Sequence, residues 1–134
     1  MALKHILVID DEADDILLIR RMLESQPNYS VVATKSGKEG LQLARKEPPD
    51  LVILDLSMPE IDGFSVVEAL KNDETTRTIP IVIVSAKDLT RQEDEFLTGQ
   101  VEALLRKGIF TEDELLEDVQ QALSHIHQKE IINL

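Results

Sequence analysis

Acidic residues stand at the ends of two strongly apolar segments of the sequence. Asp10 and Asp11 follow the segment HILVI, and Asp55 follows LVIL. If these segments are neighbouring strands, the three carboxylates meet, and two of them about 5 Å apart repel each other by roughly 3 kcal/mol at an effective dielectric constant of about 20. Either one carboxylate takes up a proton or a cation binds. A set of oxygen ligands favours a hard cation such as Mg²⁺, which also binds phosphate.

A hydroxyl group and an ammonium group follow two other apolar segments. Ser85 comes after IPIVIV, and Lys107 comes after VEALL and Arg106. A carboxylate beside Mg²⁺ with a lysine opposite is suited to attack a phosphoryl group, because the metal and the ammonium neutralise charge on the transferred oxygens. We therefore expect Asp55 to be the nucleophile and to carry the phosphate as an acyl phosphate. Ser85 is expected to donate a hydrogen bond to a phosphoryl oxygen.

Five apolar, β-branched segments must position these groups. They cover residues 5–9, 30–34, 51–54, 79–84 and 101–105. The first, third and fourth are almost continuously apolar, which is typical of strands buried on both faces of a parallel sheet. Amphipathic segments alternate with them, so the sequence predicts one α/β domain, a doubly wound sheet built from right-handed βαβ units. Such sheets bind ligands at the carboxyl ends of their strands, where the acidic residues lie.

The intervening segments have the apolar spacing of helices. Their apolar residues, in chain order, are Ile16, Leu17, Leu18, Ile19 and Leu23; Leu41, Leu43 and Ala44; Phe64, Val66, Val67 and Leu70; Leu89, Phe96 and Leu97; and Leu115, Val119, Ala122 and Ile126. Ser36 with Glu39, and Thr111 with Glu114, have the spacing of capping boxes that open the second and last helices. The fourth helix is expected to be short, and residues 124–134 are expected to extend the last helix or to form a tail.

Four motifs of the sequence together resemble one known family. VIDDE (8–12), LDLSMPEIDGF (54–64), VSAK (84–87) and LLRKG (104–108) closely resemble the receiver domains of bacterial two-component response regulators. Each motif follows a predicted strand, and the likeness covers about residues 4–123. It implies a flavodoxin-like fold with strand order 2-1-3-4-5, a receiver domain over residues 1–123, and the helical extension or tail over 124–134. The stretch RKGIFTEDELL resembles receivers of hybrid histidine kinases and of stand-alone relay proteins.

The resemblance also implies roles for individual residues. Asp55 would accept phosphate from a histidine kinase or a histidine phosphotransfer protein. Asp11 and Asp55 would ligate Mg²⁺ directly with the backbone carbonyl of Ser57, and Asp10 would act through a water molecule. Lys107 stands at the position of the family's lysine. The chain would then be no enzyme towards a separate substrate, because it would catalyse only its own phosphorylation and dephosphorylation.

Phosphorylation is expected to pull Ser85 inward and to alter the face made by the fourth helix, the fifth strand and the last helix, where a downstream protein would bind. Two residues depart from the usual pattern of the family. Leu104 stands where most receivers have an aromatic switch residue, so the switch would use Ser85 with Leu104. Gly108 follows Lys107 in place of the usual proline, so the loop over 107–110 is expected to be shaped differently.

Composition narrows the classes of partner. The 134 residues carry a formal net charge of −12, which disfavours direct binding to DNA or to anionic membranes. There is no run of 18 apolar residues, no secretory leader pattern and no cysteine. We therefore expect a cytoplasmic protein without disulfides or thiolate metal sites. The apolar residues Ile131, Ile132 and Leu134 could form a dimer contact or a frayed end, and His125 and His127 are expected to be solvated.

Other functions fit the residues less well. A binding module that keeps the fold but no longer cycles phosphate is the main alternative, favoured slightly by Leu104 and Gly108. An aspartyl phosphatase of the haloacid dehalogenase kind needs Asp-x-Asp after a strand, and Asp55-Leu56-Ser57 does not supply it. A flavin carrier needs a phosphate loop after the first strand, where the acids would repel phosphate, and a Walker loop is absent. The sequence leaves open whether the chain is a single-domain regulator, a relay protein or part of a longer kinase.

Overall fold

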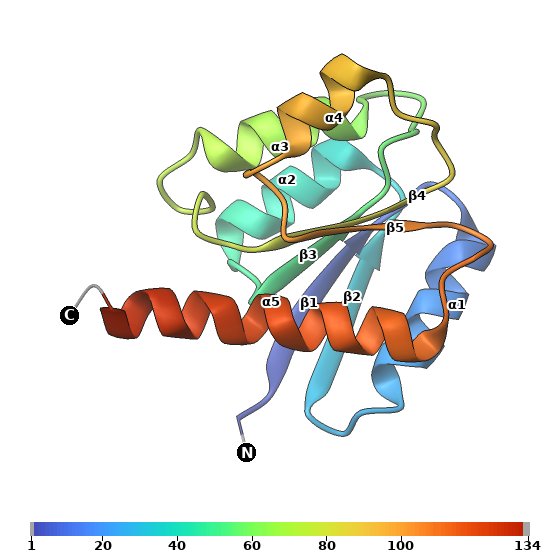
Figure 1. The fold of residues 1–134 in the computed structure, drawn as a ribbon. Helices are drawn as coiled ribbons and strands as arrows, with labels where there is room; N and C mark the ends of the chain where they lie inside the picture. The colour runs from blue at the N-terminus through green and yellow to red at the C-terminus, as the bar shows by residue number, and fades with distance from the viewer. Residues whose placement is uncertain (1, 133–134) are drawn as a thin grey trace.

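A five-stranded parallel sheet with helices on both faces makes up the computed structural model (Figure 1). The structure describes residues 2–132, with side-chain surroundings through residue 124. The elements in chain order are β1 (Lys4–Ile9), α1 (Ala13–Glu24), β2 (Tyr29–Thr34), α2 (Gly37–Lys46), β3 (Leu51–Leu54), α3 (Gly63–Lys71), β4 (Ile81–Ser85), α4 (Arg91–Leu97), β5 (Ala103–Arg106) and α5 (Glu112–Ile132). The strand order is β2-β1-β3-β4-β5, so the predicted doubly wound, flavodoxin-like fold is confirmed.

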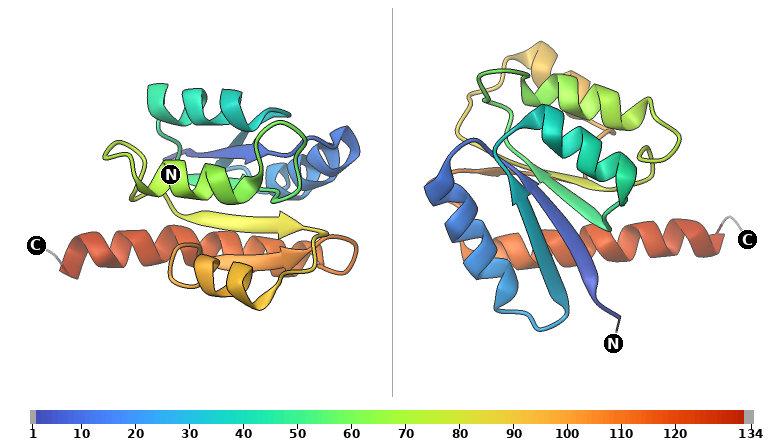
Figure 2. Two further views of the ribbon diagram at one scale, coloured as in Figure 1. Left: turned by 90° about the horizontal axis from the view of Figure 1, so that it is seen from above. Right: turned by 180° about the vertical axis from the view of Figure 1, so that it is seen from behind.

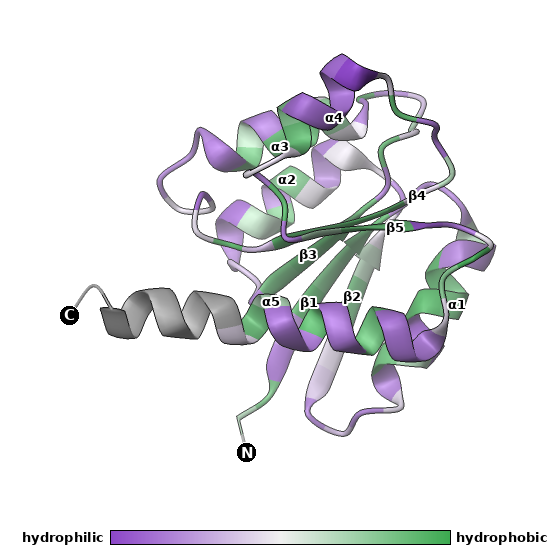
Figure 3. Ribbon diagram, in the orientation of Figure 1, coloured by the Kyte–Doolittle hydropathy of each residue, from purple (hydrophilic) through white to green (hydrophobic). Residues whose placement is uncertain are grey.

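The core has two layers, one on each face of the sheet. Alternate residues of a strand point to opposite faces. Ile6 and Val8 of β1 pack under α1 and α5, whereas Leu7 and Ile9 pack under α2, α3 and α4. Figure 2 shows helices on both sides of the strands, and Figure 3 shows most of β1, β3 and β4 in the green of hydrophobic residues. Burial on both faces explains why the central strands read as continuous apolar runs.

Helix α1 buries a narrower stripe than the sequence suggested. Ile19 and Leu23 are buried, but Leu17 and Leu18 are 47% and 46% exposed. Residues four apart lie on the same face of a helix, whereas the two leucines are rotated away from the line of Ile19 and Leu23. Of the five apolar residues noted in this segment, only Ile19 and Leu23 are fully buried.

Helix α2 begins at the predicted serine but without the full capping box. The Ser36 side chain accepts a hydrogen bond from the Glu39 N–H at 3.1 Å. The backbone N–H of Ser36 instead donates to the Thr34 hydroxyl, 3.2 Å away. The Thr34 hydroxyl at the end of β2 thus accepts the N–H bond that the Glu39 side chain would accept in a full capping box.

Strand β4 begins at Ile81 and not at Ile79 as predicted. The backbone N–H of Ile79 donates to the carbonyl of Thr76 in a turn. Pro80 has no N–H to offer to a neighbouring strand. The two apolar residues before the strand therefore belong to the connection, although their side-chain pattern continues that of the strand.

Helix α4 is short, as expected, and it begins with a capping box that the sequence analysis did not identify. Thr90 and Glu93 exchange hydrogen bonds between side chain and backbone at both positions. At its other end the N–H of Val101 still donates to the carbonyl of Leu97. Strand β5 therefore begins at Ala103, two residues after the predicted start.

Helix α5 begins with the predicted capping box. Thr111 and Glu114 each accept a hydrogen bond from the backbone N–H of the other residue. Leu115, Val119 and Ala122 are buried against the sheet. The helix continues to Ile132, so the backbone of residues 124–132 is helical. The predicted division of the chain at residue 123 stays a prediction.

Other expectations for the end of the chain fall outside the described part. The side chains of residues 125–134 are outside it, which includes both histidines, Ile126 and the apolar residues of the expected dimer contact. Among residues 2–132, no helix combines the length and the apolar character needed to cross a lipid bilayer.

Candidate functional site

Pairing of the strands brings four strand ends to one edge of the sheet. Ile9 of β1 pairs with Leu54 of β3, and the backbone N–H of Asp55 donates to the Ile9 carbonyl at 3.0 Å. Strand β5 lies on the other side of β4. The N–H of Lys107, the residue after β5, donates to the Ser85 carbonyl at the end of β4, 3.1 Å away. The sheet therefore fixes the backbone of each residue that follows a strand end, which leaves only the side chains to be oriented.

The three aspartates predicted to cluster do lie together. Each of Asp10, Asp11 and Asp55 offers a carboxylate oxygen within 4.8 Å of the others. Asp10 and Asp55 are buried and Asp11 is partly exposed. Backbone amides hold the two buried groups, because the Glu12 N–H donates to Asp10 Oδ1 at 2.9 Å and the Ser57 N–H donates to Asp55 Oδ1 at 3.1 Å.

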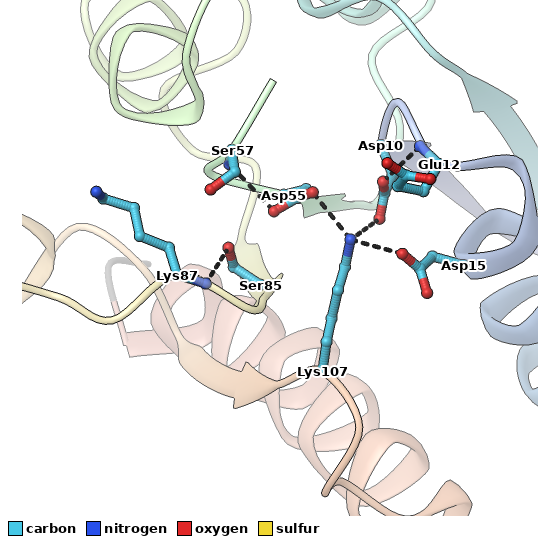
Figure 4. Close-up of polar contacts among 8 residues, drawn as sticks. All are labelled: Asp10, Glu12, Asp15, Asp55, Ser57, Ser85, Lys87 and Lys107. Atoms are coloured by element: carbon cyan, nitrogen blue, oxygen red, sulfur yellow. Dashed lines mark hydrogen bonds and ion pairs between the residues drawn. The ribbon is translucent and has the colours of Figure 1, made fainter. Parts of the chain in front are cut away.

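Lys107 reaches across the edge of the sheet into the acidic cluster (Figure 4). Its ammonium nitrogen lies 2.9 Å from Asp10 Oδ2 and 2.9 Å from Asp55 Oδ2. A third carboxylate, Asp15 in the first turn of α1, lies 2.8 Å away through its Oδ2. The sequence analysis missed Asp15. A signal was available, because Asp15 lies only four residues after Asp11, in the acidic stretch that begins the helix following the first strand.

Burial and charge shift the proton affinities of this cluster. Burial raises the pKa of Asp10 to about 6, even though the Glu12 N–H and the Lys107 ammonium lower it. Burial alone would lower the pKa of Lys107, but its contacts with Asp15, Asp55 and Asp10 raise it above the ordinary value. The lysine is therefore a fixed positive charge at neutral pH. Asp10 takes up a proton as the pH falls through its pKa of about 6.

The described oxygens fit a hard cation. Asp10 Oδ2 is buried, and within the described part of the chain its one partner is the Lys107 ammonium 2.9 Å away, which also contacts Asp15 and Asp55. A buried carboxylate oxygen that shares its one cation with two other acids has capacity for a further positive partner. Carboxylates from two adjacent strand ends are the ligand type that Mg²⁺ prefers. The cluster could therefore hold a metal ion.

The two residues expected to form the switch lie on neighbouring strands. Ser85 is buried at the end of β4, and its hydroxyl oxygen accepts a hydrogen bond from the Lys87 N–H at 3.3 Å. Leu104 pairs with Ile83 across β4 and β5 and is 44% exposed. The loop after Lys107 contains Gly108 with a φ of 85°, a conformation that favours glycine.

A close backbone approach shapes the loop that follows Asp55. A Cβ atom on Gly63 would lie 2.5 Å from the Asp55 carbonyl oxygen and 2.5 Å from Leu56 Cα. The Gly63 N–H donates to the Leu56 carbonyl at 2.9 Å, and Asp62 caps α3 through the Ser65 N–H. The loop over residues 57–62 thus folds the start of α3 directly onto the backbone of Asp55.

Comparison with known proteins gives one consistent result. The family described as response regulator receiver domain matches residues 6–128. The polar-differentiation response regulator DivK of Brucella ovis is 35% identical over 106 residues, which are 79% of this chain and 85% of that protein.

Two solved structures are similar in both sequence and fold. The N-terminal domain of a response regulator receiver protein from Methanoculleus marisnigri is 34% identical, with a TM-score of 0.73 over 91% of this chain and 98% of that one. A sensor protein from Polaromonas is 29% identical, with a TM-score of 0.82 over 92% and 98%.

Proposed function

The chain belongs to the response regulator receiver domain family, and from this membership we propose that Asp55 accepts a phosphoryl group from a histidine kinase or a histidine phosphotransfer protein. One observation supports the proposal most strongly. Asp55 is buried at a strand end, with one carboxylate oxygen 2.9 Å from the Lys107 ammonium and others of the cluster within 4.8 Å. A buried acid in this setting is arranged for chemistry, since a purely structural role would not require two further carboxylates beside it.

Mg²⁺ is the proposed cofactor. Asp11, Asp55 and the backbone carbonyl of Ser57 would hold it directly, and Asp10 would hold it through a water molecule. When bound, the ion supplies positive charge beside the oxygens of the incoming phosphoryl group. The buried Asp10 Oδ2, which shares its one cation with two other acids, and the proximity of the three carboxylates support this assignment.

The residues of the chain would perform the transfer itself. A carboxylate oxygen of Asp55 attacks the phosphorus of a phosphohistidine, an O–P bond forms, the P–N bond breaks, and the imidazole leaves with the electron pair of that bond. Lys107 neutralises charge on a phosphoryl oxygen. The Ser85 hydroxyl can donate to another, because its contact with Lys87 uses only an oxygen lone pair.

The output would be a change of surface. Ser85 moves towards the phosphoryl group, the loop between β4 and α4 follows, and the face formed by α4, β5 and α5 changes its contacts with a downstream protein. Exposure of Leu104 on this face supports a protein contact there. We further propose that the chain acts in the cytoplasm, does not bind DNA directly, and has no catalytic activity beyond its own phosphorylation and dephosphorylation.

A phosphodonor assay tests the proposal. The protein is incubated with Mg²⁺ and acetyl phosphate, and its intact mass is measured. We expect one phosphoryl group on the wild type, none on Asp55→Ala, and none when a chelator removes the metal. Asp50→Ala is the matched control, because Asp50 stands before the same strand and accepts the His5 N–H at 2.7 Å, far from the cluster.

The assay also separates the two candidate functions. An unlabelled wild type would contradict the phosphoacceptor role and favour a phosphorylation-independent binding module. Equal labelling of Asp55→Ala and the wild type would contradict the assignment of the acceptor residue.

A further inference from the structure

Lys107 has no free donor in the resting site. An ammonium group carries three N–H bonds, and three carboxylate oxygens lie between 2.8 and 2.9 Å from its nitrogen. In the proposed function the same ammonium must contact a phosphoryl oxygen. One of the three carboxylates therefore has to give up its contact before Lys107 can serve the reaction.

Asp15 is the partner that can be released at the lowest cost. The side chains of Asp10 and Asp55 are 2% and 3% exposed, whereas that of Asp15 is 35% exposed. A buried carboxylate that loses its cation stays unpaired, while a partly exposed one is hydrated again. Asp15 also lies outside the group of carboxylates close enough to hold a cation.

We propose that Asp15 is a positioning residue that holds the Lys107 ammonium in the unphosphorylated protein and releases it to the phosphoryl group, so that the carboxylate at position 15 slows phosphorylation of Asp55. The inference rests on the proposed function. The Asp15 carboxylate competes with the transferred phosphoryl oxygens for the Lys107 ammonium. Removing the charge at position 15 should therefore speed the transfer.

A simpler role for Asp15 has to be separated from this one. Acids in the first turn of a helix are favoured by the helix dipole, and α1 has two of them, Asp14 and Asp15. Asp14 is exposed. Asp14→Asn therefore removes the same charge from the same helix turn and leaves the contacts of Lys107 in place, which makes it the matched control for Asp15→Asn.

The first measurement is the rate of phosphorylation of the full chain by acetyl phosphate with saturating Mg²⁺. We expect Asp15→Asn to react roughly five-fold faster than the wild type, as expected for the loss of one partly exposed ion pair. Asp14→Asn should stay within about two-fold of the wild type, because it changes only the screened long-range field. Asp15→Glu restores a carboxylate and should return the rate towards the wild-type value.

The second measurement does not depend on phosphorylation. In the metal-free protein, the ¹⁵N resonance of the Lys107 ammonium, assigned with Lys107→Arg, should shift in Asp15→Asn and stay unchanged in Asp14→Asn. A shift that both variants share would show only a change in the general field and would overturn the proposal. An unshifted resonance in Asp15→Asn would do the same, because the contact would then be absent in solution.

The outcomes distinguish the two levels of inference. If the wild type is phosphorylated on Asp55 and Asp15→Asn reacts no faster than Asp14→Asn, the proposed function stands and the role of Asp15 is overturned. A slower reaction of Asp15→Asn also overturns it, because Asp15 would then assist the lysine. If the wild type takes up no phosphate at all, the proposed function itself fails.

Discussion

Replacement of Asp10 by asparagine is expected to stabilise the metal-free protein near neutral pH. Burial raises the pKa of Asp10 from 3.8 to about 6. One pKa unit corresponds to about 1.4 kcal/mol, so ionisation of this carboxyl destabilises the folded state by about 3 kcal/mol relative to the unfolded chain. Asparagine can still accept the Glu12 N–H bond that Asp10 Oδ1 accepts at 2.9 Å. The shift already includes the attraction of Lys107, but the NH₂ group of asparagine can lie beside the ammonium, so we expect a net gain of about 1–2 kcal/mol.

The pH dependence follows from the direction of the shift. The pKa in the folded protein is above the value in the unfolded chain, so the folded state binds the proton more tightly. The stability from this proton is fully present below the unfolded value of 3.8 and is lost as the pH rises through about 6. The advantage of Asp10→Asn should therefore be absent at the acid end of this window and reach its maximum above it.

Urea unfolding in a chelator, repeated across this pH range, measures the effect. Asp14→Asn is the control for the general loss of one negative charge from a protein whose formal net charge is −12. Saturating Mg²⁺ should reverse the order of stability, because a ligand stabilises the folded state that binds it more tightly and Asp10→Asn lacks one proposed ligand. The reasoning would be refuted if Asp10→Asn were less stable than Asp14→Asn in the chelator, or if their difference did not change with pH.

Two further substitutions test how the site is supported. Gly63→Ala should lower the free energy of unfolding by about 2 kcal/mol or more, because its Cβ would meet backbone atoms 2.5 Å away. In the control Gly40→Ala the nearest atom is a side-chain end at 2.4 Å, so its loss should be smaller, and equal losses in urea unfolding would contradict the argument. Thr90→Ala removes one half of the capping box with Glu93 and should cost about 1 kcal/mol, which a shift of the urea midpoint measures. An unchanged midpoint would mean that the cap adds no stability.

Local patterns in the sequence predicted the architecture of the chain. Continuous apolar runs indicated strands buried on both faces, and alternation with amphipathic segments indicated parallel pairing. Because parallel strands end at the same edge, it followed that Asp10, Asp55, Ser85 and Lys107 would lie near one another, and the structure brings them together. Their chemical roles stay proposals until the phosphodonor assay is done.

The same patterns failed where a competing interaction decided the outcome. Ile79 continues the apolar pattern of β4, yet the turn bond to Thr76 and the missing N–H of Pro80 delay the strand. Leu17 and Leu18 are apolar, yet the direction in which α1 packs leaves them exposed. Residue type predicts preference for burial, but the neighbours of a segment decide whether burial occurs.

The sequence by itself determined the fold class and the edge at which the acids gather, because these depend on periodicity and on the rules of parallel sheets, whereas the strand order came from the resemblance to receiver domains. Only the tertiary structure decided which carboxylates the Lys107 ammonium contacts and which of them remain exposed. A long side chain from β5 can reach several acids, and its choice among them depends on distances of a few ångströms between segments far apart in the chain. Side-chain spacing within a single segment carries no information about such distances.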